Sequence, residues 1–211
     1  MSVRVVLIDS GVNVTHPHIR ELGEVHPAYA VDPSGALSEG LEQQDALGHG
    51  TAAAAAILDL APGTELHSIQ VFRDQPVCPF GVVIEAIERA LDLEPGLINL
   101  SLGTTQQAWR DELEAPIARA VSAGVTILSP AAHGGLPSLP GCLTGVTGVL
   151  MDAGLERGAP ELRESGSTEL WYASPHPREL PNLPRTANLA GVSMACANLT
   201  GFLASQALAQ A

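Results

Sequence analysis

The chain has 211 residues, of which 45% are hydrophobic and 16% are charged, and this composition excludes disorder over most of its length. Acidic residues outnumber basic ones 23 to 10, every basic residue is an arginine, and the net charge is −13, which argues against a nucleic-acid partner. We expect one domain, residues 1–211, with a core that needs no disulfide bonds.

The expected elements alternate along the chain between short strands and longer helices. Runs of apolar residues predict buried strands at residues 3–8, 66–72, 97–102, 125–128 and 146–151. Helical spacing of apolar residues predicts helices at 51–60, 82–92, 110–123 and 193–209, and Pro116 is expected to kink or shorten the third of these. This alternation indicates an α/β fold of three layers, in which a mainly parallel sheet carries helices on both faces.

Residues 152–190 break the alternation, because they are rich in glycine, proline, serine and charge. We expect loops there, around a short strand at residues 169–173. No run of about 18 apolar residues occurs, so the sequence predicts neither a transmembrane helix nor a membrane partner. The first residues lack a secretory pattern, and the three widely spaced cysteines contain no Cys-x-x-Cys pair. Both observations favour a reduced, cytoplasmic protein.

Three polar residues lie in glycine-containing turns beside expected elements. Asp9 follows the first strand, and parallel sheets bind their ligands at the carboxyl ends of strands. His49 lies between two glycines at the start of the first expected helix. Ser193 begins the last helix, where the positive helix end stabilises a developing negative charge. Each residue also has a structural interpretation on its own: a loop carboxylate, a turn histidine and a helix cap.

Taken together, these residues resemble the subtilisin-like serine proteases (subtilases, peptidase family S8), which carry Asp, His and Ser in the same order. The segments between them resemble the family too. Residues 45–51 have the pattern D-x-x-G-H-G-T, residues 99–103 read N-x-S-L-G, residues 61–71 resemble the family's Ala-Pro strand, residues 124–132 its segment from Gly-Val to Ala-Ala, and residues 16–17 its His-Pro pair. The resemblance extends from Val3 to Gly201.

The resemblance implies a serine endopeptidase that needs no cofactor. Ser193 would be the nucleophile, His49 the general base that activates it, and Asp9 the carboxylate that orients the imidazole. The N–H of Ser193 would donate one oxyanion hydrogen bond. His133 stands where the family has the asparagine that donates the other, and we expect an imidazole N–H to take its place. Losing that donor costs a subtilisin roughly 100- to 1,000-fold in turnover.

The resemblance also implies a groove for a peptide or protein substrate. Its binding residues would be Ser101, Leu102, Gly103, Ala131 and Ala132. The first three would form an edge strand that pairs with the substrate backbone. Asp45 would flank the groove and favour basic residues near the cleavage site; its alternative is a solvated loop carboxylate.

Members of the family often bind Ca²⁺, and the acidic composition permits a structural Ca²⁺ ion here. The sequence has no clustered D-x-[DN]-x-[DN]-G ligand loop, however, so it predicts no particular metal site.

A compact chain without a pro-segment suggests a dedicated intracellular protease that processes a peptide precursor, for example by removing a leader. Two alternatives stay open. A catalytically silent module that binds a peptide or protein would explain His133, together with Val192 and Ala197, which replace the family's usual threonine and proline. Attack of an amine on the acyl-enzyme would instead make the protein a transpeptidase or macrocyclase.

Overall fold

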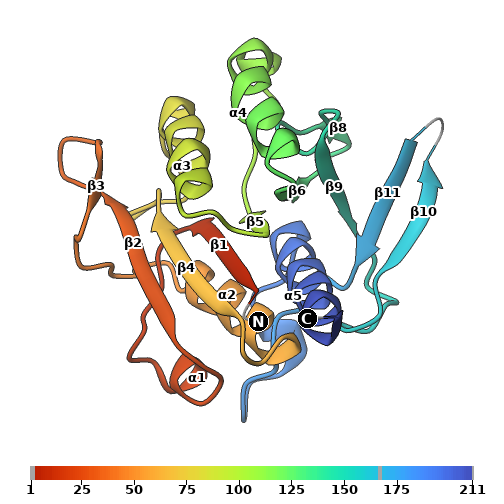
Figure 1. The fold of residues 1–211 in the computed structure, drawn as a ribbon. Coiled ribbons are helices and arrows are strands. Elements are labelled where there is room, and N and C mark those ends of the chain that lie inside the picture. The colour runs from red at the N-terminus through yellow and green to blue at the C-terminus, as the bar shows by residue number, and fades with distance from the viewer. Residues whose placement is uncertain (1–2, 166–167, 211) are drawn as a thin grey trace.

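The structure is a computed structural model and describes residues 3–165 and 168–210. In this part of the chain nine strands form one sheet with helices on both of its faces (Figure 1), which confirms the expected α/β architecture. Seven neighbouring strands are parallel, and one antiparallel strand is added at each edge.

The strands of this sheet are β1 (Arg4–Asp9), β2 (Val25–Val31), β3 (Leu37–Glu39), β4 (Glu65–Gln70), β5 (Leu97–Leu100), β6 (Thr126–Pro130), β9 (Val146–Met151), β10 (Glu161–Ser165) and β11 (Thr168–Ala173). Their order across the sheet is β10-β11-β9-β6-β5-β1-β4-β2-β3. A separate hairpin consists of β7 (Ala132–His133) and β8 (Leu136–Pro137). The helices are α1 (Pro17–Arg20), α2 (His49–Leu60), α3 (Phe80–Asp92), α4 (Arg110–Ser122) and α5 (Val192–Gln210), with short 3₁₀ turns at Gln107–Trp109 and Arg185–Ala187.

The expected strands and helices all occur, with shifted ends, and the strand at residues 169–173 lies within β11. Pro116 does not shorten its helix, because α4 continues through it to Ser122. The sequence pattern missed β2, which contains Pro27 and a bulge after it, and it missed the edge strands β3 and β10. Residues 166–167 of the expected loop region lie outside the described residues.

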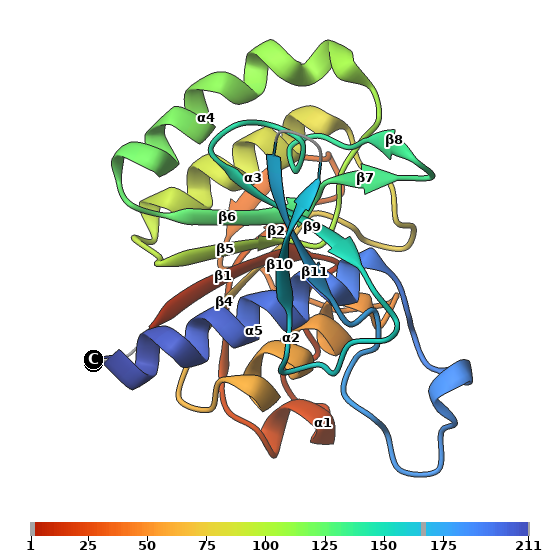
Figure 2. The ribbon, with the colours of Figure 1, turned by 90° about the vertical axis from the view of Figure 1, so that its right-hand side faces the viewer.

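The helices form two layers that bury opposite faces of the sheet (Figure 2). Helices α3 and α4 cover one face, while α1, α2 and α5 cover the other. Because aromatic residues are only 3% of the chain, both interfaces consist mainly of Ala, Val, Leu and Ile. Among the described residues, α5 is long and apolar enough to span a membrane by length and composition alone. Its packing against α2 and the sheet accounts for that composition, since it is a helix of the core.

Helices α2 and α5 pack against each other through very small side chains. Residues 53–56 of α2 are fully buried alanines, and Gly201 of α5 faces the C-terminal part of α2. A Cβ atom at Gly201 would lie 2.9 Å from Cβ of Leu60 and 3.1 Å from the carbonyl oxygen of Ile57. The two backbones therefore approach closely. This places their first residues, His49 and Val192, on the same cavity.

This close packing can be tested by stability measurements on two glycine variants. Gly201→Ala should destabilise the fold by about 1–3 kcal/mol, because the added methyl group overpacks the α2–α5 contact. Gly81→Ala in α3 is the matched control. Its Cβ would meet no atom within 4 Å, so it should stabilise the helix by about 0.5 kcal/mol. Urea unfolding followed by circular dichroism measures both changes, and equal effects at the two sites would contradict the close approach.

Candidate active site

A cavity of about 430 Å³ opens at the ends of α2 and α5 where these helices begin. His49, Ser193 and His133, which are far apart in the sequence, all line it. The other lining residues are Leu47, Phe72, Pro76, Ser101, Leu102, Gly103, Pro130, Ser138, Leu189 and Val192. The cavity thus lies at the carboxyl ends of the parallel strands, where this kind of sheet binds its ligands.

Asp9 and His49 form a tight pair at the edge of this cavity. Nδ1 of His49 lies 2.8 Å from Oδ1 and 3.0 Å from Oδ2 of Asp9. The aspartate side chain is only 2% exposed, and its Oδ1 also accepts a hydrogen bond of 2.7 Å from the N–H of Ser10. An ionised Asp9 requires the proton of a neutral His49 on Nδ1. The other ring nitrogen, Nε2, then carries a free lone pair.

The charges around His49 make it a stronger base than a free histidine. Burial of the ring lowers the pKa of His49, while the charge of Asp9, its hydrogen bond and the charge of Asp45 raise it. The raising effects prevail, so the pKa lies above its ordinary value. His49 can therefore accept a proton and hold it as an imidazolium beside Asp9.

The hydroxyl of Ser193 is held by Ser101, which directly follows strand β5. Its Oγ donates a hydrogen bond of 2.9 Å to the carbonyl oxygen of Ser101, and the Ser101 hydroxyl donates one of 3.1 Å to the carbonyl oxygen of Ser193. Because a hydroxyl carries one proton, the bond to the carbonyl oxygen of Ser101 must break before the Ser193 hydroxyl can donate to His49. Because Ser193 is the second residue of α5, its backbone N–H has no acceptor within the helix and is available to a ligand.

A buried polar chain, for which no role was predicted from the sequence, anchors the Ser193 region to β5. Nδ2 of Asn99 donates to the hydroxyl of Ser101 at 2.7 Å, and the hydroxyl of Thr200 donates to Oδ1 of Asn99 at 2.8 Å. Asn99 and Thr200 are fully buried. The signal was present in the sequence, because Asn99 opens the N-x-S-L-G segment and Thr200 lies two helical turns beyond Ser193.

His133 lies on the β7–β8 hairpin at the mouth of the cavity. Its side chain is exposed and lines the cavity together with Ser193. The neighbouring Ala131 and Ala132 are not among the residues that line it, so their expected place in the groove receives no support from the structure. The carbonyl oxygen of Ala131 instead accepts a hydrogen bond of 3.0 Å from the N–H of Ser138.

Ser101, Leu102 and Gly103 do line the cavity, as their expected role requires. Ser138 and Leu139 of the same chain lie close to the backbone of Gly103. A Cβ there would lie 2.5 Å from Oγ of Ser138 and 2.7 Å from the carbonyl oxygen of Leu139. Gly103 is therefore needed to admit the segment that follows the hairpin.

A second cavity of about 390 Å³ continues from this one and shares four of its residues. The shared residues are Phe72, Pro76, Leu102 and Gly103. Phe80, Val83 and Trp109 line its far side. Cys78 also lines it, and burial raises the pKa of this thiol to about 11, so it is protonated at neutral pH.

Asp45 is not among the residues that line the active-site cavity, and its carboxylate has partners within the chain. Oδ1 accepts hydrogen bonds from the hydroxyl of Ser10 and the N–H of Gly48, each at 2.8 Å. Oδ2 accepts from the N–H and the hydroxyl of Thr51, at 2.8 and 2.6 Å. The carboxylate thus holds the start of α2 to the end of β1, and it accepts from N–H groups that have no partner within the helix.

Replacing Asp45 by asparagine should therefore act on His49 and on stability together. The loss of a negative charge should lower the pKa of His49, and the loss of acceptors for the start of α2 should cost about 1 kcal/mol of unfolding free energy. NMR titration of the His49 ring and urea unfolding measure the two effects. An unchanged titration midpoint would show that Asp45 does not act on His49.

Within residues 3–165 and 168–210, no group of three or more His, Cys, Asp or Glu side chains is arranged to hold a metal ion.

Cys196 is fully buried beneath Ser193, and burial raises the pKa of its thiol. The thiol behaves as a small apolar group of the core.

Comparison with known proteins agrees with this arrangement. A sequence model of the subtilase family matches residues 2–135, which is more than half of the chain. The subtilisin of Bacillus pumilus is 28% identical over 143 residues, which are 64% of this chain and 48% of that protein. The chain thus spans about half the length of this curated relative.

Solved structures share the fold over nearly the whole chain. A cold-adapted subtilisin-like serine proteinase superposes with a TM-score of 0.73 and 18% identity over 99% of this chain and 76% of that one. The prenylagaramide maturation protease PagA superposes with a TM-score of 0.72 and 21% identity, over 99% of this chain and 76% of that one. The nisin leader peptidase NisP of Lactococcus lactis superposes with a TM-score of 0.71 and 18% identity, over 96% of this chain and 76% of that one.

Proposed function

Because the chain belongs to the subtilase family, we propose that it is a serine endopeptidase in which Asp9, His49 and Ser193 form the catalytic triad. One observation supports this most strongly. Asp9 holds Nδ1 of His49 at 2.8 Å, and the ring shares a cavity with Ser193 at the start of α5. A merely structural turn histidine would not need a buried carboxylate on one nitrogen and a cavity that it shares with a serine.

The proposed reaction begins when Ser193 releases the carbonyl of Ser101 and donates to Nε2 of His49. His49 takes the proton while Oγ attacks the scissile carbonyl carbon, and Asp9 stabilises the imidazolium that forms. The bond to the leaving amine then breaks, and His49 returns the proton to that amine. A water molecule, activated by His49 in the same way, hydrolyses the acyl-enzyme and restores Ser193.

We assign the oxyanion hole to the N–H of Ser193 and the imidazole N–H of His133. Both lie on the same cavity, and the first turn of α5 adds a positive partial charge.

His133→Ala should therefore lower kcat by about 100- to 1,000-fold with little change in KM, because the donor acts on the charged intermediate. His133→Asn, which restores an N–H donor, should recover part of the loss. Peptide hydrolysis kinetics measure both, and an unchanged kcat in His133→Ala would remove His133 from the reaction.

We further propose that the substrate is a peptide precursor from which a leader is removed, in the cytoplasm. Two proteins of the same fold are a maturation protease and a leader peptidase, which supports this choice. The two continuous cavities beside Ser193 offer space for several residues of an extended chain. The apolar residues that line both cavities favour apolar side chains of the substrate. Cys78, Cys142 and Cys196 are free thiols, as in a reducing compartment.

The function is tested by treating the folded protein with a fluorophosphonate and measuring its intact mass. One adduct, mapped to Ser193 by peptide fragmentation, would support an activated serine. A folded protein without an adduct would favour the silent binding module. Addition of an amine during turnover of a peptide then separates hydrolysis from ligation, because only an acyl-enzyme resolved by the amine yields the amide product.

A further inference from the structure

Ser193 and Ser101 are joined by two hydrogen bonds that run in opposite directions. The Ser193 hydroxyl donates to the carbonyl oxygen of Ser101 at 2.9 Å, and the Ser101 hydroxyl donates to the carbonyl oxygen of Ser193 at 3.1 Å. In the proposed reaction the first bond breaks, because the Ser193 proton goes to His49. The second bond is then the one that holds the first turn of α5 to the residue after β5 while Oγ attacks.

This second bond depends on how the Asn99 side chain is turned. Nδ2 of Asn99 donates to the Ser101 hydroxyl at 2.7 Å, so that hydroxyl keeps its own proton for the carbonyl oxygen of Ser193. If the amide were turned over, Oδ1 would face the same hydroxyl and compete for its proton. The orientation of a fully buried amide thus decides where Ser101 donates.

Thr200 fixes this orientation from the other end of the amide. Its hydroxyl lies 2.8 Å from Oδ1 of Asn99 and 2.9 Å from the carbonyl oxygen of Cys196. The Cys196 carbonyl is also the acceptor for the helical N–H of Thr200, whereas Oδ1 is a buried acceptor that needs this donor. Thr200 is itself fully buried, so bulk water does not compete for the bond.

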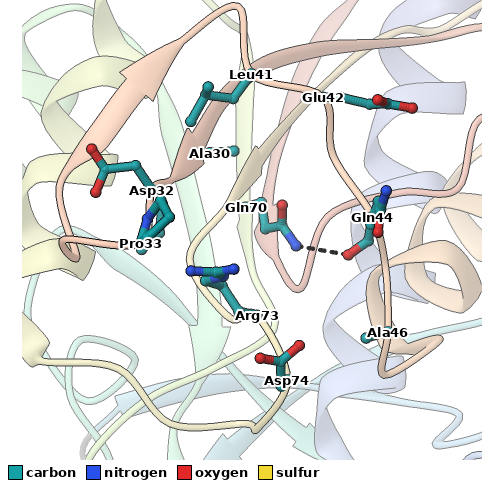
Figure 3. Close-up of a pocket in the computed structure, with 11 residues that line it drawn as sticks. Ala30, Asp32, Pro33, Leu41, Glu42, Gln44, Ala46, Gln70, Arg73 and Asp74 are labelled. Carbon is teal, nitrogen blue, oxygen red and sulfur yellow. Dashed lines mark hydrogen bonds between the residues drawn. The ribbon is translucent and has the colours of Figure 1, made fainter.

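The buried amide of Gln70 is held in a different way. Its nitrogen donates to the backbone carbonyl oxygens of Ser10 and Gln44 at 3.0 and 2.9 Å, and Figure 3 shows the bond to Gln44. A carbonyl oxygen can only accept, so these partners fix the Gln70 amide without another side chain. Asn99 has a hydroxyl at each end, and a hydroxyl can donate or accept. The orientation of Asn99 therefore depends on Thr200.

We propose that Thr200 is a positioning residue for the nucleophile Ser193 and acts through Asn99 and Ser101. The inference rests on the proposed peptidase function. Thr200 lies two helical turns beyond Ser193 and does not line the active-site cavity, so it reaches the reaction only through this chain of hydrogen bonds. Its effect should fall on the attack of Oγ, when the bond from Ser101 holds Ser193, and not on substrate binding.

The test measures kcat and KM of three variants on a peptide that the wild-type protein cleaves. Thr200→Val, which removes the hydroxyl and nearly keeps the volume, should lower kcat about tenfold with little change in KM, because Ser193 is then misplaced for attack. Thr200→Ser, which keeps the hydroxyl, should recover most of the rate. Thr64→Val is the matched control and should keep kcat. It removes a buried hydroxyl that donates to the carbonyl oxygen of Ala61 at 2.8 Å, in the turn between α2 and β4.

A double variant shows whether Thr200 acts through Ser101. Ser101→Ala removes the hydroxyl that the chain orients and should also lower kcat about tenfold. Adding Thr200→Val should cause no further loss, because both changes break the same chain. Additive losses, or a wild-type kcat in either single variant, would overturn the proposal. An equal loss in Thr64→Val would overturn it too, because the effect would then be that of any lost buried hydrogen bond.

The orientation of the amide is measured by NMR without turnover. In the wild-type protein the side-chain amide protons of Asn99 should show stronger nuclear Overhauser effects to Ser101 than to Thr200. The reverse order would overturn the proposal even if Thr200→Val did not fold. The fluorophosphonate test separates the two proposals. A protein that labels at Ser193 and keeps its kcat in Thr200→Val loses only the role of Thr200, whereas a folded wild-type protein without an adduct loses the peptidase function.

Discussion

Replacement of Ser193 by alanine is expected to lower the rate of peptide hydrolysis by about 10⁶-fold. The size of the effect is that of nucleophile removal in a subtilisin, a relative of this chain. Without Oγ no acyl-enzyme can form, and the residual rate comes from the oxyanion donors and substrate positioning alone. The measurement is kcat on a peptide that the wild-type protein cleaves, with the fluorophosphonate adduct determined in parallel.

Ser205→Ala provides the matched control, because it removes a hydroxyl from the same helix. The Ser205 hydroxyl donates only to the carbonyl oxygen of Phe202 within α5, at 2.7 Å. This variant should keep both the rate and the adduct. If Ser193→Ala folds and still cleaves at the wild-type rate, the nucleophile lies elsewhere.

Replacement of Asp9 by asparagine is expected to lower kcat by about 10⁴-fold and to change the pH profile of kcat/KM. The rate falls because a neutral amide in place of the carboxylate no longer fixes the proton on Nδ1 of His49 or stabilises the imidazolium. The profile changes because the charge of Asp9 raises the pKa of His49. His49 acts as a base only when neutral, so activity is lost as the pH falls through its pKa. Without the charge of Asp9 this acid limb should move to lower pH.

Initial rates between pH 5 and 9 measure both parts of this prediction. Glu114→Gln is the control, because it removes one exposed negative charge on α4, which covers the opposite face of the sheet from α2 and His49. An acid limb of Asp9→Asn that stays in place would show that another group controls it. A limb that moves to higher pH would contradict the sign of the electrostatic effect.

Much of this site could be predicted from the sequence, because its parts are local. Asp9 ends an unbroken apolar run, and His49 and Ser193 begin helices, so elementary rules place each at the same edge of a parallel sheet. What brings His49 and Ser193 onto one cavity is the close packing of α2 and α5. The alanines at residues 52–56 are typical of a closely packed helix, but a run of alanines does not indicate which helix packs against it.

The remaining features depend on contacts between distant segments. Asp45 is one of several aspartates in polar loops, and only the folded chain brings Ser10 and Thr51 to its two oxygens. Strand β2 contains a proline that a sequence pattern treats as a strand breaker, although a bulge absorbs it. The Gln70 amide looks like an ordinary polar end of a strand until Ser10 and Gln44 are seen to occupy its nitrogen.

The seam of alanine and glycine between α2 and α5 makes the spacing of His49 and Ser193 a property of the backbone. Long side chains at a helix interface can change rotamer and absorb a shift, but methyl groups and hydrogens have nothing to rearrange. Any substitution in the seam is therefore transmitted along both helices to their first turns. Related chains should therefore vary little in this seam. Selectivity should evolve instead at the loops around the cavities, which can change without moving either helix.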